Sequence, residues 1–200
     1  MALTDNLVSY YKMEGNSNDS VGSNNGTDTS VTYSAGNGKI GEGAGFASSS
    51  TIIYPAQTDP TTISFWIKIT TIASKSIFLS SSPDNAIGGR STDKIQLYDG
   101  TDRIASNNWI KSVRTHYCFV YIGSAYAIYQ NGSFLENLTC NKLQIRQIGR
   151  SASNGFTGEI DEVGFWSRAL SASEVTELYN AGAGLTYPFV SNQANFLAFF

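Results

Sequence analysis

The chain has 200 residues, of which 14% are charged, and carries a formal net charge of −3 with an isoelectric point near 5.1. This length predicts one ordinary domain with a sizeable core. The acidic balance excludes the basic surface that a nucleic-acid backbone requires, and no run approaches the ~18 apolar residues needed for membrane insertion. Because Ser, Thr, Asn, Gly and Tyr are abundant, we expect a surface of hydroxyls, amides and rings.

The dominant hydrophobic period is two, which is typical of strands with one face on a core. Segments Gly15–Gly26 and Ser34–Gly45 are loops by composition. Short strands with turn-rich joints predict an all-β, antiparallel two-sheet sandwich of the jelly-roll kind. In chain order we expect strands at Leu7–Glu14, Thr51–Tyr54, Ile63–Ile69, Ser76–Ser80, Lys94–Tyr98, Thr115–Ile122, Ala125–Gln130, Ser133–Thr139, Leu143–Ile148 and Glu159–Trp166.

Both cysteines are predicted to be free, buried thiols. Turns at Gly123-Ser124 and Asn131-Gly132 place Cys118 opposite Tyr129 and put Cys140 past the end of the third strand of a meander. The outer strands of such a meander lie roughly 9–10 Å apart. This exceeds the ~7 Å limit between the Cα atoms of a disulfide.

One helix is expected after Leu170, about ten residues long by its pattern. Ser171 and Glu174 fit a capping box, Val175 begins an apolar stripe, and Gly182 is the expected left-handed stop. Since so short a helix is unstable alone in water, it must lie against the sandwich.

We divide the chain into a domain at residues 1–188 and an apolar tail at residues 189–200. The tail either packs back on the sandwich or contacts other protein subunits, and the sequence leaves both open. Its apolar residues are Phe196, Leu197, Phe199 and Phe200.

The sequence resembles the laminin G-like, concanavalin A-like jelly-roll family found in bacterial surface proteins and phage structural proteins. The resemblance spans residues 7 to about 187 and ends in a helix preceded by RALS at 168–171. The other motifs that carry it are LVSYYKMEG at 7–15, DSVGSNNGT at 19–27, GKIGEG at 38–43, TISFWIK at 62–68, YQNG at 129–132, IGRS at 148–151 and GEIDEV at 158–163. It implies a recognition module in a virion or cell-surface assembly rather than free in the cytoplasm. Residues 1–6 lack the pattern of a secretory signal.

The family often joins its N-terminal loop to its last strand with calcium, an ion that prefers six to eight oxygen ligands. The resemblance therefore implies a structural Ca²⁺ held by Asp19, Asn24 and Asp161. The alternative is that Asp19 forms an Asx-turn and Asp161 accepts amide hydrogens from a loop.

The acids of the last strand also raise the possibility of a glycoside hydrolase. Related glycosidases carry three acids on one face, but alternation gives Glu159, Asp161 and Val163 here. Glu162 faces the other way unless a bulge re-aims it. The single histidine, His116, has no neighbouring acid, so we expect a structural imidazole and no enzyme activity.

Glycan binding suits the composition, because sugars stack on rings and bond to amides and hydroxyls. The tryptophans are expected to be packing residues first, with a stacking platform as the alternative. Loops at one end of a sandwich are equally suited to recognition. The candidate ligand residues are Trp66, Tyr98, Asp99, Asn107, Asn108 and Arg150.

We therefore expect a non-catalytic module that binds a glycan or another cell-surface ligand, without nucleic acid or membrane insertion. The alternative is a structural virion, decoration or tail protein whose main role is assembly with other subunits.

Overall fold

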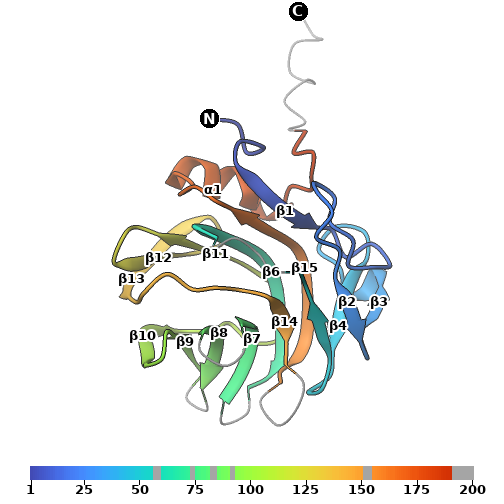
Figure 1. The fold of residues 1–200 in the computed structure, drawn as a ribbon, viewed down its shortest axis with the longest axis horizontal. Helices are drawn as coiled ribbons and strands as arrows, with labels where there is room; N and C mark the ends of the chain where they lie inside the picture. Colours follow the sequence, from blue (N-terminus) through green and yellow to red (C-terminus); the bar gives the residue numbers. More distant parts are fainter. Residues whose placement is uncertain (56–59, 73–74, 82–84, 91–92, 151–154, 191–200) are drawn as a thin grey trace, which may run out of the picture.

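The computed structural model describes residues 1–55, 60–72, 75–81, 85–90, 93–150 and 155–190. They form two antiparallel sheets of eight and seven strands and one short α-helix, which confirms the predicted sandwich (Figure 1). Within these residues, none of the helices is long and apolar enough to cross a bilayer.

The larger sheet contains β1 (Leu7–Tyr11), β3 (Thr32–Ser34), β4 (Gly43–Phe46), β6 (Thr62–Thr71), β11 (Thr115–Tyr121), β12 (Ala125–Gln130), β13 (Ser133–Thr139) and β15 (Thr157–Trp166). The smaller sheet contains β2 (Thr27–Thr29), β5 (Thr51–Ile53), β7 (Lys75–Ser81), β8 (Asn85–Arg90), β9 (Lys94–Tyr98), β10 (Asp102–Asn108) and β14 (Gln147–Gly149). Short 3₁₀ turns lie at η1 (Ala35–Asn37) and η2 (Asn180–Gly182).

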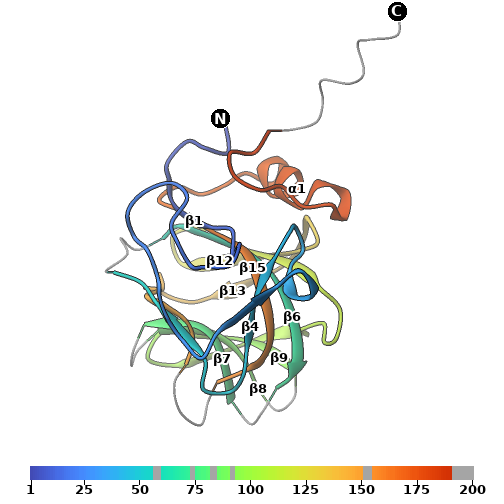
Figure 2. The same ribbon diagram turned by 90° about the vertical axis from the view of Figure 1, so that its right-hand side faces the viewer.

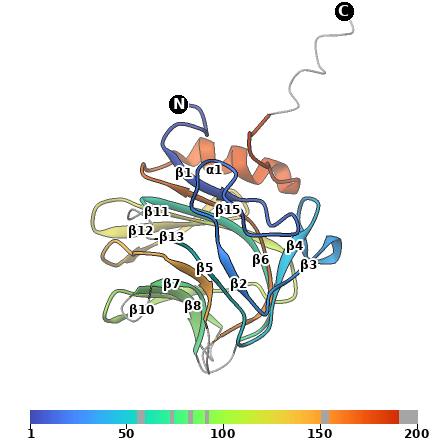
Figure 3. The same cartoon turned by 45° about the vertical axis from the view of Figure 1, so that its right-hand side comes forward.

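The strand order of the larger sheet is β13-β12-β11-β6-β15-β4-β3, and β1 also pairs with β15. The order of the smaller sheet is β10-β9-β8-β7-β14-β5-β2. Figures 2 and 3 show the helix α1 (Ala172–Tyr179) beside the larger sheet, on the side away from the smaller one. Two hydrophobic layers follow: a core between the sheets and a second, smaller one under α1.

The core between the sheets is built by alternation, as β6 illustrates. Ile63, Phe65, Ile67 and Ile69 are fully buried in it. The ring of Phe65 stacks on Phe119 of β11 with 5.9 Å between centroids. Because each such side chain contributes roughly 1.5–3 kcal/mol when buried, the alternating pattern is enough to hold the two sheets together.

The sequence analysis did not predict five of the strands, namely β2, β3, β4, β8 and β10. Their sequences are polar or rich in glycine, and β2 and β3 are exposed at sheet edges. Such strands exist because a neighbouring strand pairs with them, a condition that local propensity does not contain. The predicted loop Ser34–Gly45 was therefore wrong where β4 begins.

Two predicted strands are shorter than expected. The first ends at Tyr11, and Met13 follows with a left-handed φ of 59°. In the segment Leu143–Ile148 only the last residues enter a ladder, as β14, although Leu143 and Ile145 are fully buried. Buried apolar residues therefore need not lie in a strand.

The cysteine prediction is confirmed. Cys118 pairs in register with Tyr129, and the backbone amide of Cys140 bonds to Ser124 beyond the end of β13. Both thiols are free and buried. Burial raises the pKa of Cys140 to about 12, so both act as small apolar groups.

The helix begins with the predicted capping box between Ser171 and Glu174. Arg168 bonds to the carboxylate of Glu174 and helps hold its pKa at about 2. The helix has eight residues, and its left-handed stop is Asn180 with φ 47°, not Gly182 as predicted. Asn takes this conformation at modest cost, so the chain turns two residues earlier than its glycine suggested.

We expect Ser171→Ala to lower the free energy of unfolding by about 1 kcal/mol, because the amide of Glu174 loses its side-chain acceptor. Urea unfolding measures the change. Glu177→Ala, at an exposed position of the same helix and outside the capping box, is the control and should stay within about 0.5 kcal/mol of the parent. Equal losses in both variants would contradict a capping role.

Candidate ligand-binding site

A β-bulge in β15 breaks the alternation of its acids. The register against β6 shifts between Asp161 and Gly164, and Glu162 has a left-handed φ of 50°. Ile160 and Val163 both enter the core between the sheets, so the two residues between them turn outward together. Strict alternation, which would turn Glu162 away from Asp161, does not hold here, and the bulge that the sequence left open re-aims the side chain.

Asp161 holds the loop that follows η1. Its Oδ2 accepts hydrogen bonds from the backbone amides of Lys39 at 2.6 Å and Ile40 at 3.0 Å, and its Oδ1 accepts one from Glu162 at 2.9 Å. This is the plainer of the two predicted roles. Burial raises the pKa of Asp161 to about 7, although the three amides favour its charged form.

Glu162 is buried to 3% exposure, and neither carboxyl oxygen has a hydrogen-bond partner within the described residues. It lies near the hydroxyls of Tyr10 and Thr186, and burial raises its pKa to about 8. The hydroxyl of Tyr10 donates instead to the carbonyl of Leu185 at 3.0 Å. The two neighbouring acids therefore lie beneath the segment at residues 183–190, which we name the C-terminal segment.

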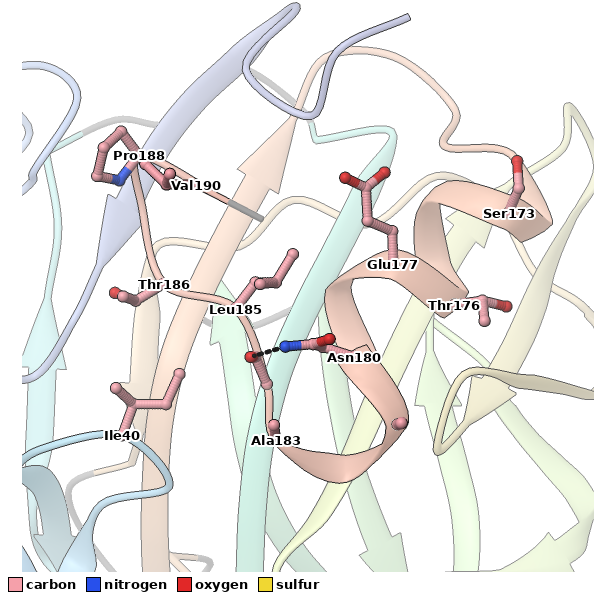
Figure 4. A pocket seen from close by; sticks show the side chains of 12 residues that line it. Ile40, Ser173, Thr176, Glu177, Asn180, Ala183, Leu185, Thr186, Pro188 and Val190 are labelled. Atoms are coloured by element: carbon pink, nitrogen blue, oxygen red, sulfur yellow. Dashed lines mark hydrogen bonds between the residues drawn. The ribbon is translucent and has the colours of Figure 1, made fainter. Parts of the chain in front are cut away.

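A groove of about 1030 Å³ lies between α1 and the C-terminal segment, shown in Figure 4. Its apolar residues are Ile40, Leu185, Pro188 and Val190. Its polar side chains are Ser173, Thr176, Glu177, Asn180 and Thr186. A concave site with an apolar wall and a few polar groups is the usual form of a small-ligand site.

The walls of the groove are held by internal hydrogen bonds. The amide of Asn180 donates to the carbonyl of Gly184 at 2.9 Å, the bond drawn in Figure 4. The hydroxyl of Thr176 donates to Gly132 at 2.9 Å. Gly184 packs so closely that a Cβ would lie 3.3 Å from Nε1 of Trp66. The groove is thus a built feature of the fold, joined to the larger sheet.

None of the groove residues was predicted from the sequence. The helix was expected to cover the sandwich, but its partner wall comes from the turn at Asn180 and the return of residues 183–190 over Tyr10. These residues carry no spacing or composition that marks a site, so sequence reasoning had no signal for them.

Trp66, a predicted ligand residue, is 4% exposed. Tyr179 stacks on its ring with 5.7 Å between centroids, and the ammonium of Lys39 lies 4.8 Å from its centre. Trp109 and Trp166 are also buried, and their indole nitrogens donate to Gly88 and Leu3. The structure therefore places all three tryptophans as packing residues.

The other predicted ligand residues do not converge on one site. Tyr98 and Asp99 lie at the turn between β9 and β10, where Asp99 pairs with a neighbouring arginine. Asn107 and Asn108 end β10, and Asn107 donates to Glu136 of β13. Arg150 follows β14. The predicted tail residues lie outside the described residues, so their contribution stays a prediction.

The predicted calcium ligands are engaged in hydrogen bonds within the protein. Asp19 accepts three backbone amides, including an Asx-turn from Val21, and the side chain of Asn24 donates to Ser9. No cluster of three or more acidic, His or Cys side chains among the described residues could hold a metal. Calcium binding stays a prediction.

The groups considered for catalysis are all engaged or enclosed. The carboxylate of Glu159 forms ion pairs with Lys68 at 3.0 Å and with Arg114. His116 is 1% exposed, its Nε2 shares a hydrogen bond with Ser64 at 2.8 Å, and burial lowers its pKa to about 3. It is a structural imidazole, as predicted.

Together the two-sheet fold and the groove define a lectin-like jelly-roll domain. A family model described as the concanavalin A-like lectin/glucanases superfamily matches residues 25–176, and the chain belongs to this superfamily. Among curated proteins, none is similar enough to count as a relative.

Several solved structures share the fold at low sequence identity. Domain 4 of AbnA, an extracellular arabinanase of Geobacillus stearothermophilus solved with arabinotriose, has a TM-score of 0.67 and 21% identity over 86% of this chain and 97% of its own. The binding domain of botulinum neurotoxin DC, solved with SialylT, has a TM-score of 0.66 and 14% identity over 88% of this chain and 51% of its own. A Trypanosoma rangeli sialidase has a TM-score of 0.67 and 14% identity over 90% of this chain and 34% of its own.

We expect Glu162→Gln to flatten the pH dependence of stability. The folded pKa of about 8 exceeds the ordinary glutamate pKa of 4.5, so between these pH values the folded state keeps a proton that the unfolded chain has lost. The free energy of unfolding then falls as pH rises through this window, by up to about 1.4 kcal/mol per pH unit. Urea unfolding at pH 5, 6.5 and 8 measures the slope. The control is the exposed Glu177→Gln, and a slope unchanged in Glu162→Gln would refute the assignment.

We expect Asp161→Ala to lower hydrogen-exchange protection at the amides of Lys39 and Ile40, because both lose their acceptor. Each orphaned amide costs about 1–3 kcal/mol if it stays buried, so the loop should detach. Exchange followed by NMR resolves these amides. Asp93→Ala, which removes a surface ion pair with Lys111, is the control. Unaltered protection at Lys39 and Ile40 would show that the carboxylate does not hold the loop.

Proposed function

We propose that this protein is a non-catalytic recognition module that binds carbohydrate in the groove between α1 and the C-terminal segment. The observation that carries the proposal is the composition of the groove, where apolar residues such as Leu185 lie beside the carboxylate of Glu177 and the hydroxyl of Ser173. A sugar needs both, because its C–H faces are apolar and its hydroxyl groups seek polar partners.

The similar structures support this ligand class. The arabinanase domain, which this chain matches over nearly its full length, was solved with arabinotriose. The neurotoxin binding domain, of which this chain spans about half, was solved with SialylT. At these identities the likeness carries the fold alone, so the ligand has to be argued from the groove.

The absence of catalysis is part of the proposal, since one similar structure is a sialidase. Most glycoside hydrolases use two accessible carboxyls about 5–5.5 Å apart, or 6.5–9.5 Å with a water between them. Among the acids of β15, Glu159 is held by two cations, and Asp161 and Glu162 are buried. If the parent protein releases reducing sugar and the Glu159→Gln variant does not, the proposed absence of catalysis is wrong.

We expect Ala183→Trp to weaken saccharide binding at least tenfold, because the indole fills the groove that Ala183 lines. Ala183 has φ −73°, which any L-residue adopts, so the fold should persist. Ala172→Trp, an exposed alanine on α1 outside the groove, is the matched control. A glycan array identifies the ligand and calorimetry measures the affinity. A silent array contradicts carbohydrate binding, and full affinity in Ala183→Trp contradicts the groove.

The second candidate is a structural subunit of a virion or cell-surface assembly that contacts other subunits through residues 189–200. Val190, the last described residue, is 74% exposed, and the apolar residues Phe196, Leu197, Phe199 and Phe200 follow it in the sequence. Light scattering of the chain with these four residues changed to serine separates the candidates. Loss of assembly together with a silent glycan array favours the structural role.

A further inference from the structure

A second concavity lies on the outer face of the larger sheet, which also carries α1. We name it the sheet hollow; it has a volume of about 330 Å³. Its polar side chains come from β3, β6, β15 and the turns beside them: Ser30, Thr32, Asn37, Thr70, Thr157 and Glu159. It lies apart from every residue that the sequence marked for ligand binding.

The hollow is organised by a row of residues in register across four strands. Lys68 of β6 is opposite Glu159 of β15, Glu159 is opposite Gly45 of β4, and Gly45 is opposite Thr32 of β3. Side chains opposite one another in adjacent strands point to the same face. The ladder therefore fixes how the carboxylate and the hydroxyl flank the glycine.

Gly45 lets two polar side chains lie against the backbone of β4. A Cβ at this position would lie 2.6 Å from Nδ2 of Asn37 and 2.7 Å from Oγ1 of Thr32. The amide and the hydroxyl therefore converge above the glycine, in the space that a side chain would otherwise take. Two polar groups side by side in a concavity can bond to adjacent hydroxyl groups of a sugar.

The polar groups of the hollow are free to bind a ligand. The side chains of Ser30, Thr32, Asn37, Thr70 and Thr157 make no hydrogen bond to another described residue. In the groove, by contrast, Thr176 and Asn180 already donate within the protein. Unpaired hydroxyl and amide groups in a concave site match a ligand that is itself rich in hydroxyl groups.

Glu159 gives the hollow an ordered acceptor. Its Oε1 bonds to Lys68 at 3.0 Å and its Oε2 to Arg114, which also donates to the carbonyl of Gly36 at 3.0 Å. A carboxylate has about four lone-pair sites, so each oxygen can still accept a hydroxyl hydrogen. The carboxylate lines the hollow, and two adjacent hydroxyl groups of a sugar fit its two oxygens.

The hollow and the groove share one loop. Asn37 lines the hollow and Ile40 lines the groove, three residues further along the chain. The Cα atoms of these residues are at most ~11 Å apart by chain length. Asp161 holds the amides of Lys39 and Ile40 between them, so one carboxylate positions both lining residues.

We propose that the sheet hollow is a second sugar-binding subsite, and that an oligosaccharide bound in the groove extends across the loop at residues 38–41 into it. The proposal rests on the proposed function for its ligand class. It adds a separate set of contacts, from Thr32, Asn37 and Glu159.

The test compares arabinotriose, cellotriose, maltotriose and sialyllactose with their constituent monosaccharides by calorimetry. Two variants disrupt the hollow: Thr32→Ala with Asn37→Ala deletes polar groups, and Gly45→Ala adds a Cβ that displaces the amide of Asn37 and the hydroxyl of Thr32. Thr29→Ala with Asn18→Ala, two exposed residues outside both sites, is the matched control. Thermal melting confirms that each variant is folded.

We expect both hollow variants to weaken binding of the tightest trisaccharide at least tenfold and of its monosaccharide less than twofold, with the control unchanged. If both variants keep full trisaccharide affinity while Ala183→Trp still loses binding, the subsite is overturned and the proposed function stands. Equal losses for trisaccharide and monosaccharide overturn the separate subsite. If no saccharide binds the parent protein, both proposals fall.

Discussion

The buried carboxylate of Asp161 accepts three backbone amides, and the arrangement of the outer face depends on it. The bulge in β15 turns this carboxylate outward, where it meets the loop after η1. That loop presents Asn37 to the sheet hollow and Ile40 to the groove. Since an amide buried without a partner costs about 1–3 kcal/mol, the carboxylate determines where the loop can lie. Both candidate sites follow from one hydrogen-bonded anchor.

Burial, more than exposed charge, determines the pKa and the contacts of the acids of β15. Glu162 has no hydrogen-bond partner among the described residues and sits beneath the C-terminal segment, where burial raises its pKa. Glu159 is the exception, because Lys68 and Arg114 hold it at the rim of the hollow. The acids of β15 are thus either enclosed or ion-paired within the fold.

For individual residues, the structure shows the predicted structural roles more often than the predicted ligand-binding roles. The Asx-turn at Asp19 and the loop contacts of Asp161 are both present, since each needs only a carboxylate near backbone amides. Trp66 is packed under Lys39 and Tyr179, and Asn107 is bonded to Glu136 across the sheet edge. Ring and amide side chains are equally useful for packing and for recognition. Their sequence context does not say which use the fold makes of them.

The sequence alone determined the class of fold and the start of its helix. Alternating apolar residues such as Ile63 and Phe65 require a sheet face on a core, and Ser171 with Glu174 starts a helix wherever the chain lies. Only the tertiary structure decided the bulge at Glu162, the early turn at Asn180 and the convergence of Thr32 and Asn37 over Gly45. These features depend on which strands and loops become neighbours. Because those contacts join residues far apart in the chain, no local sequence pattern predicts them.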